Sequence, residues 1–172
     1  MGVDKRISLY LGDITTLEVD AIVNAANTTL LGGGSVDGAI HAKAGPRLLD
    51  ECRTLGGCNT GDAKATSAYR LPSRFVIHTV GPVYRGGNNN EAQLLSSAYW
   101  RSLEVALEIG AKTIAFPAIS TGVYAYPLEE ATSIAITTVD KFLSEVAEDK
   151  IETVVFVSFD QKTHSIYEKM VS

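Results

Sequence analysis

A glycine-rich segment, residues 32–38, lies between an apolar run that ends at Asn27 and an expected helix. Its backbone amides and the dipole of that helix suit the binding of a phosphate group. Gly32, Gly34 and Gly38 also fit the Gly-x-Gly-x-x-x-Gly loop of dinucleotide-binding oxidoreductases, and an ordinary flexible loop is a further alternative. Against the oxidoreductase, no acidic residue ends another strand about 20 residues on, where a ribose would need it. The segment therefore predicts a phosphate site of another kind.

A second loop, residues 120–126, also lies between an expected strand and an expected helix. Amides and hydroxyls on two such loops could hold a pyrophosphate from two sides. Ser120 as a hydrolase nucleophile is a poorer interpretation, because the loop lacks a Gly-x-Ser-x-Gly elbow and His78 or His164 would have to be its base. We therefore expect the two loops to bind a ligand together.

The periodicity of apolar residues predicts the elements that position these loops. We expect strands over residues 7–11, 20–23, 63–69, 75–80, 113–117 and 153–159, and helices over 36–44, 47–54, 91–109, 127–146 and 162–170. Strands that alternate with helices imply an α/β fold, a three-layer α/β/α sandwich with a mixed, largely parallel central sheet. Its first strands are expected to pair antiparallel. Ligands bind beyond the carboxyl ends of such strands, where both loops fall.

Composition narrows the class of protein. The 172 residues fit a single domain, 1–172, and the apolar stretches are far shorter than the roughly 20 residues that span a bilayer. The net charge of −5, with 15 scattered basic residues, argues against a nucleic-acid partner or an RNA-processing role, because such binding needs clustered Lys and Arg. Without a secretory signal, we expect a cytoplasmic monomer. Cys52 and Cys58 are expected to be free thiols, and no metal is implied.

With these motifs in place, the sequence resembles the macrodomain family, and within it the MacroD type, over essentially its whole length. The matching segments are residues 12–15, 23–27, 32–41, 71–72, 76–82 and 116–127. The resemblance implies a hydrolase that binds ADP-ribose, removes mono-ADP-ribose from Glu and Asp side-chain esters and deacetylates O-acetyl-ADP-ribose, without a cofactor. ADP-ribosylated proteins would be its partners. A reader module that binds ADP-ribose without cleavage is the alternative.

The resemblance also implies roles for the substrate-binding residues. Asp13 and the amide of Ile14 would recognise the adenine edge, and Phe159 would stack on the purine, with a plain core position for Phe159 as the alternative. The residues placed around the diphosphate and its neighbouring groups are Gly34, Ser35, Val36, Gly38, Ala39, Ile40, Ser120, Thr121, Gly122, Val123 and Tyr124.

Three residues are implied at the distal ribose, where the bond to be broken lies. Asn27 would hold ribose hydroxyls, Asp37 would activate or orient water, and Tyr126 would close over the sugar. By residue type alone, Asp37 would be interpreted as a charge that favours the helix N-terminus. Asn24 and His41 are expected to be structural.

The chain departs from the MacroD pattern at two positions, with Ser35 and Ala125 where glycine is usual. If the backbone needs a positive φ there, a side chain costs on the order of 1 kcal/mol. We therefore expect Ser35 to weaken ligand binding without abolishing it.

Overall fold

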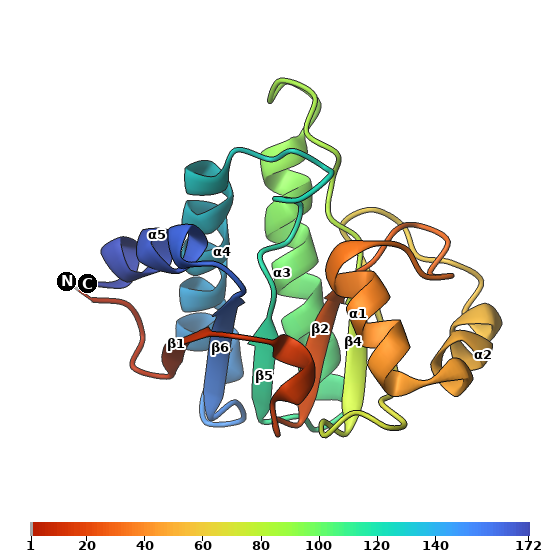
Figure 1. Ribbon diagram of the computed structural model, residues 1–172. Helices are drawn as coiled ribbons and strands as arrows, with labels where there is room; N and C mark the ends of the chain where they lie inside the picture. Colours follow the sequence, from red (N-terminus) through yellow and green to blue (C-terminus); the bar gives the residue numbers. More distant parts are fainter. Residues whose placement is uncertain (1) are drawn as a thin grey trace.

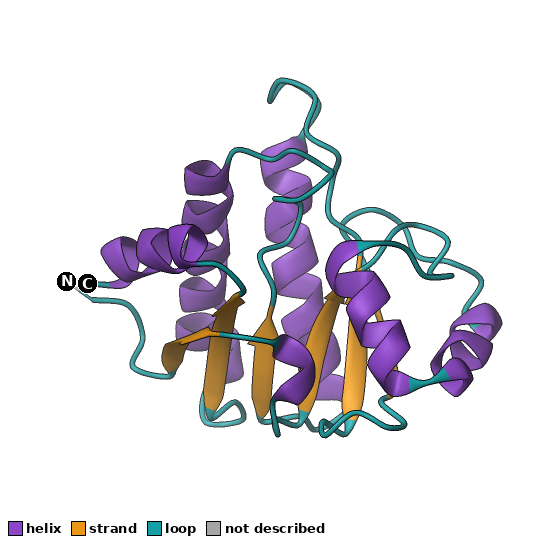
Figure 2. Cartoon of the chain, viewed as in Figure 1, coloured by secondary structure: helices purple, strands orange, loops and turns teal. Residues whose placement is uncertain are grey.

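Short apolar runs rich in β-branched residues form one mixed sheet in the computed structural model, which describes residues 2–172. Its strands are β1 (Ile7–Leu11), β2 (Ala21–Ala25), β3 (Ala63–Ser67), β4 (Phe75–Thr79), β5 (Thr113–Phe116) and β6 (Thr153–Ser158). Their order across the sheet is β1-β6-β5-β2-β4-β3. Figure 2 shows the strands side by side, with helices in front of and behind them. The neighbouring strands are parallel apart from β3 and β4, which are antiparallel.

The expectation that the first strands pair antiparallel is wrong. β1 pairs in parallel with β6 at the edge of the sheet, and β2 lies between β4 and β5. A 3-10 turn, η1 (Ile14–Thr16), leads the chain away from the edge, so β1 and β2 are not neighbours. The position of β1 at an edge also argues against the dinucleotide-binding fold, in which the first strand is central.

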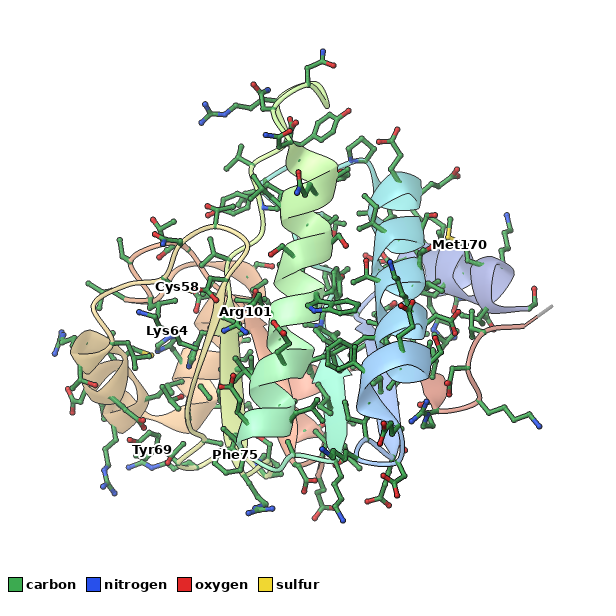
Figure 3. All side chains as sticks on the ribbon, turned by 180° about the vertical axis from the view of Figure 1, so that it is seen from behind. Cys58, Lys64, Tyr69, Phe75, Arg101 and Met170 are labelled. Atoms are coloured by element: carbon green, nitrogen blue, oxygen red, sulfur yellow. The ribbon has the colours of Figure 1, made fainter. Side chains whose placement is uncertain are left out.

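Helices cover both faces of the sheet, so the expected three-layer sandwich is confirmed. Within residues 2–172 they are α1 (Ser35–Ala44), α2 (Pro46–Thr54), α3 (Glu91–Glu108), α4 (Leu128–Phe142) and α5 (Gln161–Val171), with a π-helical turn, η2 (Leu143–Ala147), after α4. Figure 1 shows α1 and α2 on one face, and Figure 3 shows α3 and α4 from the other. None of these helices is long and apolar enough to cross a membrane.

Alternating side chains divide the core into two apolar layers. In β5, Ile114 and Phe116 belong to the layer under α3, α4 and α5, whereas Ala115 belongs to the layer under α1 and α2. Full burial of a large apolar side chain stabilises the fold by about 1.5–3 kcal/mol. Cys52 and Cys58 are free, as predicted, and both are buried. The two packed layers fix the positions of the strand ends and of the loops that follow them.

Candidate active site

The predicted site residues follow four neighbouring strands and lie at the carboxyl ends of these strands, which we call the carboxyl edge of the sheet. Asp13 follows β1, Phe159 follows β6, Ser120 follows β5 and Asn27 follows β2. Neighbouring strands lie about 4.8 Å apart. Figure 1 shows the start of α1 and the loop between β5 and α4 above this same edge. The two loops singled out in the sequence thus follow the adjacent strands β2 and β5.

Asp13 and Phe159 form one end of the site. Asp13 Oδ1 accepts hydrogen bonds from Thr15 Oγ1 (2.7 Å) and Thr15 N (2.9 Å). These bonds hold the pKa of Asp13 below its usual value, so the carboxylate is ionised and can accept a further bond through Oδ2. The side chain of Phe159 is exposed, with 81% of its surface accessible. The core interpretation of Phe159 is therefore wrong.

The loop after β5 is closed by its own backbone. Tyr126 N donates to Ser120 O (2.9 Å) and Ala125 N donates to Gly122 O (2.9 Å), while Thr121 Oγ1 donates to Ala118 O (2.9 Å). Val123 is fully open to solvent at the tip, with Gly122 and Tyr124 beside it. These bonds preorganise the loop that was predicted to meet the diphosphate.

Ser120 is not placed as a nucleophile. Its Oγ is buried, and a Cβ at Gly81 would fall within 2.2 Å of it, so the hydroxyl is pressed against the loop after β4. Both ring nitrogens of His78 contact other groups, with Nδ1 3.1 Å from Asn24 Nδ2 and Nε2 2.9 Å from Thr66 Oγ1. His78 is therefore not a base for Ser120, which argues against the nucleophile interpretation.

Two positions where the family pattern has glycine have left-handed backbone. Ser35 has a φ of 55° and Ala125 a φ of 59°, in the range that disfavours a Cβ. Both positions therefore have the positive φ at which a side chain was expected to be unfavourable. At each position the backbone has a conformation that glycine would adopt without strain.

We expect Ala125→Gly and Ser35→Gly each to raise the free energy of unfolding by about 1 kcal/mol, because the left-handed backbone then carries no Cβ. The matched control is Ala42→Gly in the exposed interior of α1, which should cost about 1 kcal/mol. Urea denaturation measures all three. A loss of stability in Ala125→Gly equal to that of Ala42→Gly would contradict the prediction.

Asp37 lies in the first turn of α1 and is almost completely buried, with 4% of its surface accessible. Its Oδ1 accepts a hydrogen bond from Asn24 Nδ2 (2.8 Å) and lies 3.4 Å from His41 Nε2. Burial raises the pKa of Asp37, and the contacts with Asn24 and His41 oppose that rise. A carboxyl whose pKa is raised toward neutrality is a better general base than an exposed one.

Asn27 and Asp37 approach each other at Gly33. A Cβ at Gly33 would lie 3.0 Å from Asp37 Oδ2 and 3.4 Å from Asn27 Nδ2. The side chain of Asn27 is fixed by its own loop, donating to Gly32 O (3.0 Å) and accepting from Thr29 Oγ1 (2.6 Å). Glycine at position 33 therefore leaves room for the two predicted residues on the same side of the loop.

Other residues predicted around the ligand occupy different depths. Val36 is half-buried and Ala39 is exposed on α1, and Gly34 lies exposed just before the helix. A Cβ at Gly38 would fall 2.7 Å from Gly33 O, so this glycine allows α1 to pack against the loop. Ile40 is fully buried in the layer beneath α1, where it packs in the core and does not face the edge.

Tyr126 is buried below its loop. Its ring lies 4.8 Å from the ring of Tyr84, and burial raises the pKa of Tyr126. Tyr84 N also donates to Tyr124 O (2.9 Å), which joins the loop after β4 to the loop after β5. The contact of Tyr126 with ribose stays a prediction. The position of the Tyr126 ring depends on the loop after β4, which was not singled out from the sequence.

Glu91, at the start of α3, organises that loop and was missed in the sequence. Its carboxylate accepts from the backbone amides of Arg85 (2.7 Å), Gly87 (3.1 Å) and Asn89 (2.6 Å). These bonds, that of Arg85 first, lower the pKa of Glu91 from 4.5 to about 2. An acidic residue after the polar run 85–90 was the only signal available, and it gives no indication of which amides it binds.

We expect Glu91→Gln to lower the melting temperature by several degrees at neutral pH, because a neutral amide binds the three backbone amides less strongly. The folded pKa is about 2 and the ordinary value is 4.5, so this stabilisation is complete above pH 4.5 and disappears as the pH falls toward 2. Thermal denaturation of both proteins should show the difference shrinking over that range. Glu108→Gln, exposed on the same helix, is the control.

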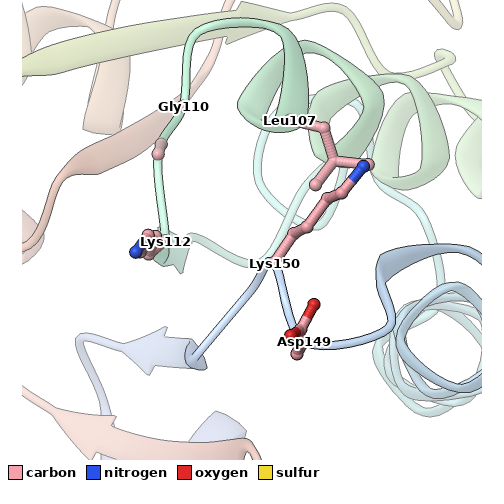
Figure 4. Close-up of a pocket in the computed structure, with 6 residues that line it drawn as sticks. Leu107, Gly110, Lys112, Asp149 and Lys150 are labelled. Atoms are coloured by element: carbon pink, nitrogen blue, oxygen red, sulfur yellow. The ribbon is translucent and has the colours of Figure 1, made fainter.

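A separate hollow lies at the opposite end of the strands, near their amino ends. It measures about 310 Å³ and lies among Leu107, Lys112, Asp149 and Lys150, before the amino ends of β5 and β6 (Figure 4). Ligands of such sheets bind at the carboxyl ends of the strands. The hollow is therefore not part of the candidate site.

An ionised carboxylate, an exposed aromatic ring, a buried carboxylate and two loops after adjacent strands thus lie at the carboxyl ends of the strands of an α/β/α sandwich, an arrangement that suits a nucleotide. Residues 23–135 match the family model of the Macro domain. A macro domain-containing protein of Chlorobaculum tepidum is 60% identical, over 93% of this chain and 92% of its own. An O-acetyl-ADP-ribose deacetylase of Citrobacter rodentium is 52% identical, over 98% of this chain and 97% of its own.

The ADP-ribose glycohydrolase MACROD2 of Xenopus laevis is 55% identical over 98% of this chain, which spans 40% of that protein's length. The crystal structure of a Trypanosoma brucei macrodomain in complex with ADP-ribose is similar as well, with a TM-score of 0.91 and 47% identity over 98% of this chain and 70% of that one. The chain belongs to the macrodomain family, and its similarity to MACROD2 supports the MacroD type.

Proposed function

We propose that this macrodomain binds ADP-ribose along the carboxyl edge of its sheet and hydrolyses esters of it. The substrates are ADP-ribose bonded to a Glu or Asp side chain and O-acetyl-ADP-ribose. Similar proteins are named as an ADP-ribose glycohydrolase and an O-acetyl-ADP-ribose deacetylase, and a similar macrodomain has been crystallised with ADP-ribose. Proteins modified on Glu or Asp are the partners in this proposal.

The observation that carries the proposal is the order of chemical groups along the edge. Asp13 and Phe159 after β1 and β6 suit an adenine, which needs a hydrogen-bond acceptor and a stacking surface. The loop after β5 and the start of α1 suit the diphosphate. Asn27 and Asp37, after β2, come next and suit the distal ribose. The order of these groups along the sheet matches the order of adenine, diphosphate and distal ribose in ADP-ribose.

In the proposed reaction, Asp37 is the general base. Water gives a proton to the ionised Asp37 carboxylate as the water oxygen attacks the carbonyl carbon of the ester. The bond between that carbon and the ribose oxygen then breaks. The proton then passes from Asp37 to the departing ribose oxygen, which restores the carboxylate. Asn27 holds the ribose hydroxyls, and Tyr126 helps to fix the bond that breaks.

The test is a hydrolysis assay with the unmodified protein, on an ester-linked ADP-ribosylated protein and on O-acetyl-ADP-ribose, paired with calorimetric titration of ADP-ribose. Release of ADP-ribose supports the enzyme. Binding without release supports the alternative, a reader module, which the positive φ of Ser35 favours because a side chain is strained where the family pattern has glycine. Failure of ADP-ribose to bind at millimolar concentration rejects both. In the same titration Ser35→Gly should bind more tightly, and an unchanged affinity rejects the role given to Ser35.

A further inference from the structure

The side-chain amide of Asn24 bridges Asp37 and His78. Asn24 lies opposite His78 in the parallel pair β2 and β4, on the face covered by α1. Its Nδ2 lies 2.8 Å from Asp37 Oδ1 and 3.1 Å from His78 Nδ1. The opposite amide orientation would bring Oδ1 of Asn24 against the carboxylate oxygen, which is repulsive. Both amide hydrogens are therefore donated, one to Asp37 and one to His78.

This arrangement fixes the tautomer of His78. Since Nδ1 accepts from Asn24, the ring hydrogen is on Nε2, which donates to Thr66 Oγ1 (2.9 Å). The hydroxyl of Thr66 in turn donates to Ser67 O (3.0 Å). Complete burial lowers the pKa of His78 to about 3, so the ring is neutral. We call Asn24, His78 and Thr66 the strand network, because β2, β4 and β3 each contribute one member.

A competing arrangement shows why Thr66 is needed. Cys52 Sγ lies 3.7 Å from His78 Nε2, and burial raises the pKa of that thiol to about 11, so it keeps its hydrogen. If the thiol donated to Nε2, the ring hydrogen would move to Nδ1 and the amide of Asn24 would have to turn over. Its oxygen would then face Asp37. The acceptor at Thr66 Oγ1 disfavours this alternative.

The strand network acts on one oxygen of Asp37 only. Asn24 binds Oδ1, whereas Oδ2 is the oxygen that lies beside Gly33, near Asn27. We propose that Asn24, His78 and Thr66 are positioning residues that hold Asp37 Oδ1 and direct Asp37 Oδ2 to the attacking water. This inference rests on the proposed function, in which Asp37 is the general base.

The test compares Thr66→Val, which removes the acceptor, with Thr66→Ser, which keeps it. Thr66→Val should lower kcat roughly 10- to 100-fold with KM and the affinity for ADP-ribose unchanged, because a small misplacement of a catalytic group is costly. Thr66→Ser should restore kcat. The matched control is Thr79→Val, a buried threonine of β4 whose Oγ1 binds Asp62 O (2.8 Å) outside the network. It should lower stability without lowering kcat.

The pH profile gives a second readout that a merely structural role would not move. Asn24 lowers the pKa of Asp37, so loss of its bond should move the acid limb of kcat to higher pH. The titratable groups that face Asp37 are His41 on α1, His78 on β4 through Asn24, and Cys52 on α2. An unmoved acid limb with unchanged kcat in Thr66→Val overturns the inference, as does an equal loss in Thr66→Ser or Thr79→Val.

Failure of the proposed function is distinguished by a readout that needs no turnover. Nitrogen chemical shifts of His78 in the whole protein should report hydrogen on Nε2, with Nδ1 unprotonated. In Thr66→Val the hydrogen should shift toward Nδ1. If the wild-type protein does not hydrolyse its substrates, the proposed function fails, and the shifts alone decide the network. Hydrogen on Nδ1 in the wild-type protein overturns the network whatever the activity.

Discussion

Asp37→Ala lowers kcat for ester hydrolysis by about 10²- to 10⁴-fold in our prediction, the range that a positioned general base contributes. The affinity for ADP-ribose changes little, because the proposed role of Asp37 is toward water and the hydrogen bonds that suit the diphosphate come from backbone amides. Single-turnover release of ADP-ribose from a protein ester measures the rate, and calorimetry measures the affinity. Wild-type activity should also fall as the pH drops through the raised pKa of Asp37, since a protonated carboxyl accepts no proton.

The control for this variant is Asp50→Ala, on the exposed surface of α2, where the carboxylate only pairs with Arg53. Such surface ion pairs contribute about 0–1 kcal/mol, so rate and affinity should both be unchanged. Full turnover in Asp37→Ala would contradict the mechanism. A phosphate of the substrate would then be the group that activates water.

The sequence predicted most of the elements because their signals are local. Gly45 and Pro46 separate α1 from α2 as expected, since Gly45 has a φ of 89° and Pro46 begins the next helix. Strand pairing is not local. β1 joins β6, some 140 residues later in the chain, and nothing within residues 7–11 identifies that partner. The pairing of the first strands was therefore predicted wrongly.

The same distinction applies to the site. The two loops could be found because each follows a strand and carries residues suited to a phosphate, whereas Asp13 and Asn27 were implied by the family resemblance. The contact of Asn24 with His78 depends on the register of β2 against β4, which a single sequence does not specify. The only hint was a polar residue within an apolar strand, where burial requires a hydrogen-bond partner.

The second prediction concerns adenine recognition by Phe159. We expect Phe159→Ala to weaken ADP-ribose binding by roughly 5- to 150-fold, because stacking of a base on an aromatic ring contributes about 1–3 kcal/mol. The melting temperature should stay that of the wild type, since the ring is 81% exposed and its removal leaves no cavity. Calorimetry measures the affinity, and thermal denaturation without ligand checks the fold.

A ligand without the base provides the control for Phe159→Ala. Ribose 5-phosphate retains a sugar and a phosphate, so its weak affinity should be the same for the wild-type protein and the variant. An equal loss for both ligands would mean that Phe159 acts on the loops and not on the base. An unchanged affinity for ADP-ribose would place the adenine away from β6, and the order of groups along the sheet edge would no longer match the ligand. The adenine and catalytic ends of the site are thus tested separately, because Phe159→Ala changes affinity whereas Asp37→Ala changes rate.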